Sequence, residues 1–336
     1  MERKYISNES INRWLTAIYD ECKCLYAPVV EANGKSSFKP VQSVDEISWN
    51  HIQTTQSPKN AAFPRTEKLF SYQKQQGDVT IQEADNAVPQ AVVLGLHPCD
   101  AKGFAPLSAI LNWDTSDKPF NERRQRLTLI SLACTRSDEY CFCTSVGGSP
   151  DSTEGSDILL TPVNAEGYLV EIITEQGNSL IDKHLQLFEP APNVDKKAVI
   201  AKVPARFDVQ KLQQKISKMF DSELWKKQSA RCIGCGACAF VCPDCACFDI
   251  QENAKGNCGE RLRCWDSCCF AQFTLHTSGH NPRPTQSARW RQRLMHKFAY
   301  MSERLSVVGC TGCGRCSRAC PVDMSLAEHL RQIENE

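Results

Sequence analysis

Apolar residues in the first part of the chain follow helical and then strand-like spacing. Between residues 8 and 24 they recur every three or four positions, which predicts an amphipathic helix that begins near Asn8. Apolar stretches at 25–30 and 37–41 then flank Asn33-Gly34, a dipeptide typical of a tight turn. We therefore expect a helix followed by a β-hairpin.

Residues 90–145 predict a strand, a helix and a second strand. The apolar runs 91–96 and 127–133 indicate buried strands, and residues 100–112 indicate a helix between them. This spacing favours a βαβ unit with parallel strands, whose carboxyl ends meet at one edge of the sheet and often form a site there. The cysteines that can converge at that edge are Cys99, Cys134, Cys141 and Cys143.

The remaining pattern predicts a second domain. Further strands are expected at 156–161 and 168–173, and residues 189–204, rich in proline and alanine, indicate a linker. Asp208 then suits the N-cap of a helix. We expect an α/β domain over residues 1–205 and an α+β, ferredoxin-like domain over residues 206–336.

Two copies of the pattern C-x2-C-x2-C-x3-C-P occur in the second domain. This pattern holds [4Fe–4S] clusters in two-cluster ferredoxins, where the fourth cysteine of each run binds the cluster of the other run. Structural zinc also binds C-x2-C pairs, but it usually takes its four ligands as two separated pairs, so clusters fit this pattern better. The expected ligands of one cluster are Cys232, Cys235, Cys238 and Cys320, and those of the second are Cys310, Cys313, Cys316 and Cys242.

A long insertion separates the two runs and carries further cysteines and a basic stretch. A charge run of this kind is usually a solvated helix face. The alternative is that it offsets the charge of a cluster or docks an acidic partner. The basic residues are Arg283, Arg289, Arg291, Arg293, His296 and Lys297, and the cysteines are Cys245, Cys247, Cys258, Cys264, Cys268 and Cys269.

Composition excludes several classes of function. The chain has 336 residues, with 39 Lys and Arg against 39 Asp and Glu, so no basic field attracts nucleic acid. No apolar run approaches the ~18 residues of a membrane-spanning helix, so an integral membrane protein is not expected. Twenty cysteines indicate ligands kept reduced, hence a cytoplasmic location. The Gly-x-Gly sequences at Gly234 and Gly312 lie among the cysteines, so no nucleotide fingerprint is recognised.

Several motifs together resemble one family. They are Leu94-Gly-Leu-His-Pro-Cys-Asp100, Tyr140-Cys-Phe-Cys-Thr-Ser-Val-Gly147, Cys242-Pro-Asp-Cys-Ala-Cys-Phe-Asp249, Trp265-Asp-Ser-Cys268 and Gly279-His-Asn-Pro-Arg283. The chain is similar, from about residue 25 onward, to the iron–sulfur beta subunits of soluble heteromeric [NiFe] hydrogenases (sulfhydrogenases) and to the corresponding iron–sulfur subunits of anaerobic sulfite reductases.

This resemblance implies a non-catalytic electron-transfer subunit of an oxidoreductase complex. Its partners would be a subunit that binds FAD and NAD(P) and a catalytic subunit, either a hydrogenase or another reductase. No catalytic residue is assigned within the chain. The alternative is a subunit that itself reduces sulfur, polysulfide or sulfite at a substrate-accessible cluster. The resemblance also implies that Cys99, Cys134, Cys141 and Cys143 hold a third [4Fe–4S] cluster.

Two features of the resemblance leave alternatives open. Three more cysteines match family positions: Cys245, Cys247 and Cys268. The interpretation favoured here is that they line a neighbouring cluster. The alternative is that they bind a fourth cluster whose remaining ligand is not a cysteine. Cys264 or Cys269 is a further candidate for the fourth ligand of such a cluster, in place of a non-cysteine group. His97 stands where relatives often carry arginine, and it is interpreted either as a group that tunes the third cluster or as a surface-loop histidine.

Overall fold

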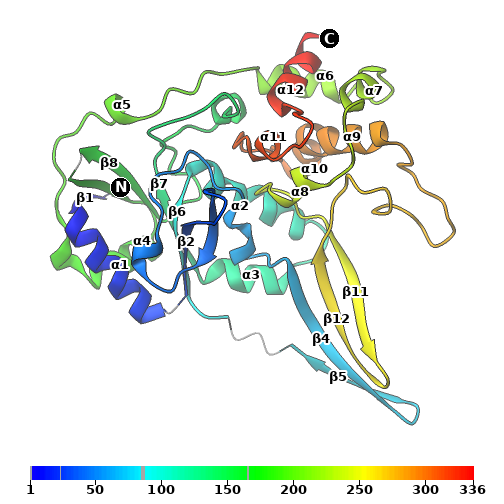
Figure 1. Ribbon diagram of the computed structural model, residues 1–336, viewed down its shortest axis with the longest axis horizontal. Coiled ribbons are helices and arrows are strands. Elements are labelled where there is room, and N and C mark those ends of the chain that lie inside the picture. The colour runs from blue at the N-terminus through cyan, green and yellow to red at the C-terminus, as the bar shows by residue number, and fades with distance from the viewer. Residues whose placement is uncertain (1, 23, 85–87, 165) are drawn as a thin grey trace.

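An eight-stranded mixed sheet forms the centre of the N-terminal part of the molecule (Figure 1). The computed structural model describes residues 2–22, 24–84, 88–164 and 166–336. The strand order is β10-β1-β9-β8-β7-β6-β2-β3; β2, β6, β7 and β8 run parallel to one another, and the other pairs are antiparallel. The strands are β1 (Glu2–Ser7), β2 (Leu25–Val30), β3 (Ser36–Pro40), β6 (Ala91–Leu96), β7 (Leu127–Leu132), β8 (Ile158–Asn164), β9 (Gly167–Ile172) and β10 (Glu189–Pro190).

The predicted βαβ unit is present as β6, α2 (Pro98–Leu111) and β7. Strands β6 and β7 pair in parallel, with Val93 opposite Leu129. Their register shifts at Gly95, where φ is +73° and an added Cβ would lie 3.2 Å from Pro28 Cδ, so a glycine suits this bulge. The predicted hairpin between β2 and β3 is also present.

Helices cover both faces of this sheet and bury two apolar cores. The helix α1 (Asn8–Cys22), which confirms the predicted amphipathic segment, packs Trp14 and Leu15 into one core, together with α4 (Glu175–Asp182). On the other face, α2 and α3 (Lys118–Gln125) contribute Phe104 and Phe120. Burial of whole aromatic and aliphatic side chains stabilises such layers by about 1.5–3 kcal/mol each.

A second sheet joins two distant parts of the chain. Its order is β11-β12-β4-β5, all antiparallel, and it projects away from the rest of the molecule as a long ribbon (Figure 1). The sheet therefore pairs strands from both sides of the predicted boundary at residue 205. Its strands are β4 (Thr66–Gln75), β5 (Asp78–Glu83), β11 (Phe248–Lys255) and β12 (Cys258–Trp265).

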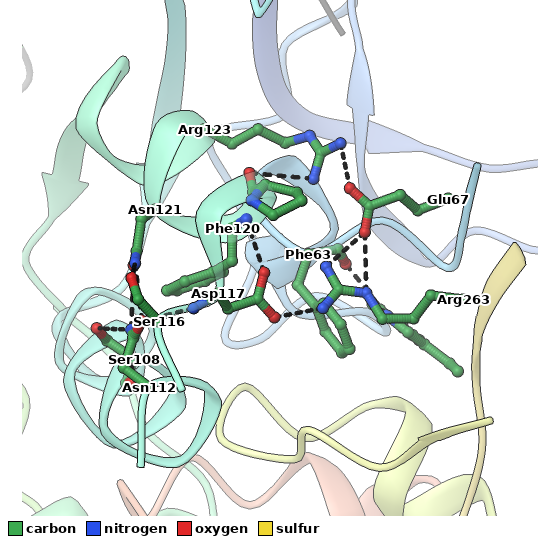
Figure 2. Close-up of polar contacts among 12 residues, drawn as sticks. Phe63, Glu67, Ser108, Asn112, Ser116, Asp117, Phe120, Asn121, Arg123 and Arg263 are labelled. Carbon is green, nitrogen blue, oxygen red and sulfur yellow. Dashed lines mark hydrogen bonds and ion pairs between the residues drawn. The ribbon is translucent and has the colours of Figure 1, made fainter. Parts of the chain in front are cut away.

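Buried ion pairs fix this second sheet to the first part of the chain. Figure 2 shows the Glu67 carboxylate of β4 between the guanidinium groups of Arg123 and Arg263. Arg263, on β12, also pairs with Asp117, whose carboxylate caps α3 by accepting from Phe120 N. Two carboxylates thus meet two guanidinium groups, which compensates the cost of burying each charge.

The C-terminal part consists of short helices and cysteine loops around a third core. Trp225, Trp290 and Phe298 are among its buried side chains. Asp208 caps α6 by accepting from the amides of Gln210 and Lys211, as predicted. The helices are α6 (Val209–Ile216), α7 (Leu224–Ser229), α8 (Ala237–Phe240), α9 (Gln286–Met295), α10 (Met301–Leu305), α11 (Arg315–Arg318) and α12 (Leu326–Asn335).

Shorter elements complete the chain. The predicted linker is mostly irregular, but it contains β10, which pairs with β1, and the short helix α5 (Lys196–Val199). Within the described residues, no helix combines the length and apolar character that crossing a membrane requires. The remaining turns are 3-10 helices at η1 (Val44–Glu46), η2 (Pro58–Ala61), η3 (Cys143–Val146) and η4 (Leu185–Leu187), and a π-helical turn at η5 (His296–Tyr300).

Candidate metal centres

Four cysteines of the predicted first cluster line one cavity. Three come from the first run and one, Cys320, from the end of the second run. The cavity also touches Cys316 and Cys269, and Trp290 and Met324 supply apolar walls. This is the arrangement that crossed ligation predicts. The four thiols are those of Cys232, Cys235, Cys238 and Cys320.

The two cysteine runs have the same backbone conformation. Gly234 and Gly236 have φ values of +70° and +73°, and Gly312 and Gly314 have φ values of +68° and +72°. Such values favour glycine. Each run then enters a four-residue helix, α8 or α11. The chain therefore repeats one tight loop twice, as a site built from two equivalent halves requires.

The cysteines of the predicted second cluster lie deeper. Cys242, Cys310 and Cys313 are all buried. Burial raises the pKa of Cys313 to about 11, and both Arg315 and the Asp100 carboxylate act on this thiol. Lys297 Nζ donates to Cys242 Sγ at 3.3 Å and also to the backbone oxygen of Gly309, which precedes Cys310. Lys297 therefore lies beside cysteines from both runs.

The front cysteines gather at the carboxyl edge of the parallel strands, as the βαβ unit predicts. Cys99 lies in the first turn of α2 and Cys134 follows β7. The pKa of Cys134 and that of Cys143 are each raised to about 12, mainly by burial; the charges of Cys134 and Cys141 contribute to the shift of Cys143. Because a thiol must lose its proton to bind iron, a metal centre would favour the thiolates that burial alone disfavours.

Polar side chains also contact the front cysteines. Gln53 Nε2 donates to Cys99 Sγ at 3.4 Å, and Arg318 Nη2 donates to Cys141 Sγ at 3.2 Å. Donors of this kind suit sulfur atoms that carry negative charge. The environment therefore fits a thiolate-bound cluster.

The front loop packs directly on the second run. Phe142 N donates to the backbone oxygen of Gly312 at 3.0 Å. A Cβ added at Gly312 would lie 2.6 Å from Cys143 Cα, so a side chain has no room there. Cys313 and Cys99 are close enough for the charge of Cys313 to raise the pKa of the Cys99 thiol further, beyond the dominant effect of burial and that of Asp100. The three cysteine sets thus lie in a row in space, with the second set between the first and the third.

Buried cations surround the cysteines between the two runs. Arg293 Nη1 donates to Cys245 Sγ at 3.4 Å, and its Nη2 donates to Cys238 O at 2.8 Å. Lys59 Nζ donates to Cys245 O at 2.8 Å and lies 4.0 Å from the centroid of the Trp265 ring. Arg293 and Lys297 are each at most 3% exposed. The interpretation of the basic stretch as a solvated helix face is therefore wrong for these two residues. Arg289 is also buried.

Several residues near the cysteines were not identified from the sequence. Lys59 carries no sequence signal, because its contact depends on a loop distant in the chain. Gln286 donates to Cys232 Sγ at 3.0 Å. Arg315, which pairs with Asp100, and Arg318 lie inside the second cysteine run, so their spacing could have indicated them. Arg293 and Lys297 are four residues apart on one helical face.

His97 is not a surface-loop residue. It is 4% exposed, its Nδ1 lies 3.0 Å from Leu132 O, and its ring packs 4.8 Å from that of His51. Burial lowers the pKa of His97 below its ordinary value, so the ring is neutral at neutral pH. The charge of Arg315, which pairs with Asp100, lowers the pKa of His97 further.

Six further cysteines lie in the insertion between the two runs, and three of them share a cavity. Cys245, Cys247 and Cys268 line a second cavity. Cys269 lies 3.6 Å from Cys238, measured between their sulfur atoms. Cys258 is exposed at the start of β12, and Cys264 lies within that strand. Across the described parts of the chain, no three His, Cys, Asp or Glu side chains have the geometry to hold a single metal ion.

Comparison with known proteins agrees with this geometry. Residues 231–324, which include both runs, match the family described as a 4Fe-4S dicluster domain. The chain is therefore an iron–sulfur protein whose C-terminal part is a ferredoxin-like dicluster domain. It is 29% identical over 320 residues to the sulfhydrogenase 2 subunit beta of Pyrococcus furiosus, an alignment that covers 92% of this chain and 91% of the relative. The predicted resemblance to hydrogenase beta subunits is confirmed.

A second relative supports the same class. The chain is 24% identical over 177 residues to the F420-dependent formate dehydrogenase subunit beta of Methanocaldococcus jannaschii. This match covers 49% of the chain and 38% of that relative. No solved structure matches the chain significantly. Both relatives are beta subunits of oxidoreductases, which supports an electron-transfer subunit.

Proposed function

We propose that this chain relays electrons through three [4Fe–4S] clusters between a subunit that binds FAD and NAD(P) and a catalytic hydrogenase or reductase subunit. Cys232, Cys235, Cys238 and Cys320 hold the first cluster. Cys310, Cys313, Cys316 and Cys242 hold the second. Cys99, Cys134, Cys141 and Cys143 hold the third.

The observation that carries this proposal is the continuous order of the three cysteine sets. Cys316 of the second set lines the cavity of the first set, and Gly312 of the second run touches Cys143 of the third. When bound, the clusters supply one-electron transfer without any bond being made or broken in this chain. The chain itself holds the thiols in place, and of the twelve only that of Cys235 belongs to an exposed residue.

Cationic side chains beside the cysteines favour the more negative, reduced state of the second and third centres. Lys297 faces Cys242, and Arg318 faces Cys141. A positive charge held close in a poorly solvated site interacts strongly with added negative charge. The cations therefore help the chain to accept an electron.

The partner subunits are inferred from the names of the relatives. A beta subunit belongs to an assembly, and the two relatives are named for a sulfhydrogenase and a formate dehydrogenase. By analogy, bond-making chemistry is assigned to a partner polypeptide. Flavin and nicotinamide binding is assigned to a second partner, because this chain carries no recognised dinucleotide fingerprint.

Anaerobic stopped-flow absorbance of the purified chain tests this proposal. Dithionite should bleach the clusters, whereas NADPH and NADH should not do so until a flavoprotein partner is added. Prompt bleaching by either nucleotide alone would contradict the relay. Oxidation of the reduced chain by polysulfide or sulfite, with turnover of that substrate, would favour the alternative of a substrate-reducing subunit. Cys99→Ala should lower the iron content by about four atoms per chain, because it removes a ligand of the third cluster.

A further inference from the structure

A second cavity, with a volume of about 250 Å³, is lined by three cysteines that the three proposed clusters do not use. Cys245 and Cys247 follow the first run, and Cys268 follows β12. The hairpin of β11 and β12 brings them together, since Phe248 pairs with Trp265 and Asp266 N donates to Cys247 O at 2.9 Å. One water molecule needs only about 10–15 Å³ of such space, so the cavity has room for more than a single ion.

A buried carboxylate lines the same cavity. Asp244 is 3% exposed, and neither of its oxygen atoms has a hydrogen-bond partner among the described residues. Its neighbouring cation, Lys297 Nζ, is 3.8 Å away. An added Cβ at Gly103 of α2 would lie 2.9 Å from Asp244 Oδ1, so the glycine makes room for this carboxylate. Burial of a carboxylate without donors is costly, and coordination of a metal is one way to compensate it.

Cationic side chains around the cavity favour ionised thiolates over neutral thiols at its cysteines. Arg283, Arg293 and Lys297 line it, whereas Asp244 is the acidic residue among its lining side chains. Arg293 Nη1 points its donor at Cys245 Sγ, 3.4 Å away. Three thiolates and one carboxylate would supply four negative charges beside these cations and a positively charged iron–sulfur core. Neutral thiols would leave the cations without sufficient compensation.

We propose that this cavity holds a fourth [4Fe–4S] cluster, bound by the thiolates of Cys245, Cys247 and Cys268 and by the carboxylate of Asp244 at its fourth iron. This inference rests on the proposed function, because it adds a centre to the same relay. It replaces the interpretation of these cysteines as groups that merely line a neighbouring cluster.

The position of this fourth site makes it a branch of the relay. The sulfur of Cys269 lies 3.6 Å from that of Cys238 of the first set, and Cys269 directly follows Cys268 in the chain. Cys245 packs with Cys242 of the second set in one buried cluster. The fourth cluster would therefore neighbour two others, whereas the third cluster contacts the second run through the loop at Gly312.

The test measures iron, acid-labile sulfide and zinc in the full chain purified without oxygen, together with the EPR spectrum after reduction by dithionite. Cys247→Ala and Cys268→Ala should each lower iron and sulfide by about four atoms per chain. Cys258→Ala, which removes an exposed cysteine at the start of β12, should leave both unchanged. Unchanged iron and an unchanged spectrum in Cys247→Ala would overturn the proposal. So would one zinc ion per chain that Cys247→Ala removes.

The carboxylate ligand is tested separately. Asp244→Cys should retain the iron and shift the EPR signal of one cluster, because thiolate replaces carboxylate. Asp244→Ala should lose about one iron and show a three-iron signal in the oxidised state. Identical spectra for wild type, Asp244→Cys and Asp244→Ala would exclude Asp244 as a ligand. Failure of Cys99→Ala to lower iron would instead contradict the third cluster of the relay, so the two failures are distinguishable.

Discussion

The ammonium group of Lys297 lies 3.3 Å from the sulfur of Cys242, and both side chains are buried. Lys297 is part of the π-helical turn η5, a distortion that often marks functional sites. The same ammonium donates to Gly309 O, next to Cys310. One cation is thus placed at the junction of the two cysteine runs.

Removal of this charge should lower the reduction potential of the second cluster. Reduction adds negative charge, which Lys297 stabilises and the uncharged side chain of Lys297→Met does not. We expect a decrease of roughly 60 mV, which corresponds to a tenfold change in a one-electron equilibrium. An EPR-monitored redox titration of the full chain measures it.

Two further variants make this prediction specific. Lys297→Arg keeps the positive charge and should recover most of the potential. Lys227→Met removes an exposed lysine of α7 and should leave every potential unchanged. A potential in Lys297→Met equal to that of wild type would show that this charge does not act on the cluster.

Gly312→Ala should disrupt the contact between the front loop and the second run. The new Cβ would lie 2.6 Å from Cys143 Cα, and φ is +68°. Gly279→Ala is the matched control, since its φ is +83° and no described atom lies within 4 Å of the added Cβ. The control should cost about 1 kcal/mol of stability from backbone strain alone. Gly312→Ala should lower the stability by more than this and should also lower the iron content. Equal losses of stability and equal iron contents in the two variants would contradict the prediction.

Crossed ligation makes a further prediction about single cysteines. Cys242→Ser should perturb the EPR signal of the cluster that Cys310, Cys313 and Cys316 bind. Cys320→Ser should perturb the other ferredoxin-type cluster, because its thiol lines the cavity of the first run. The opposite pattern would mean that each run completes its own cluster.

Local patterns were sufficient to predict the cysteine runs and the βαβ unit. The two runs have fixed spacing, and the strands β6 and β7 are continuous apolar segments, so neither depends on distant contacts. The pairing of β4 with β12 was not predicted, because it joins segments far apart in the chain whose partners the sequence does not specify. The ion pair of Glu67 with Arg263 arises only once that pairing exists.

The burial of the cations near the cysteines was likewise not predicted from the sequence. The basic stretch has polar composition, and composition alone favours a solvated face. Arg289, Arg293 and Lys297 nevertheless recur every four residues beside Trp290, Leu294 and Phe298, which places them on a face that packs against the cysteine loops. Lys59 reaches Cys245 from the short 3-10 helix η2, which no periodic pattern of the sequence indicates.

The histidine of α12 should make the protein less stable in mild acid. His329 is buried, its Nδ1 has no hydrogen-bond partner within the described parts of the chain, and its ring contacts Trp290 with 5.2 Å between centroids. Burial, assisted by the charge of Arg231, lowers the pKa of His329 to about 4. The unfolded chain binds a proton near the ordinary pKa of about 6.5, whereas the folded chain does not until about pH 4, so stability falls as the pH falls between these values.

Protonation of His329 in the unfolded chain should lower the free energy of unfolding by about 2 kcal/mol between pH 7.5 and pH 5. His329→Gln keeps a polar side chain that does not titrate, so its thermal unfolding temperature should fall by several degrees less over the same range. The measurement compares thermal unfolding of the two full chains under anaerobic conditions, where cysteine protonation affects both alike. Parallel curves for wild type and variant would show that His329 is protonated equally in the folded and unfolded states.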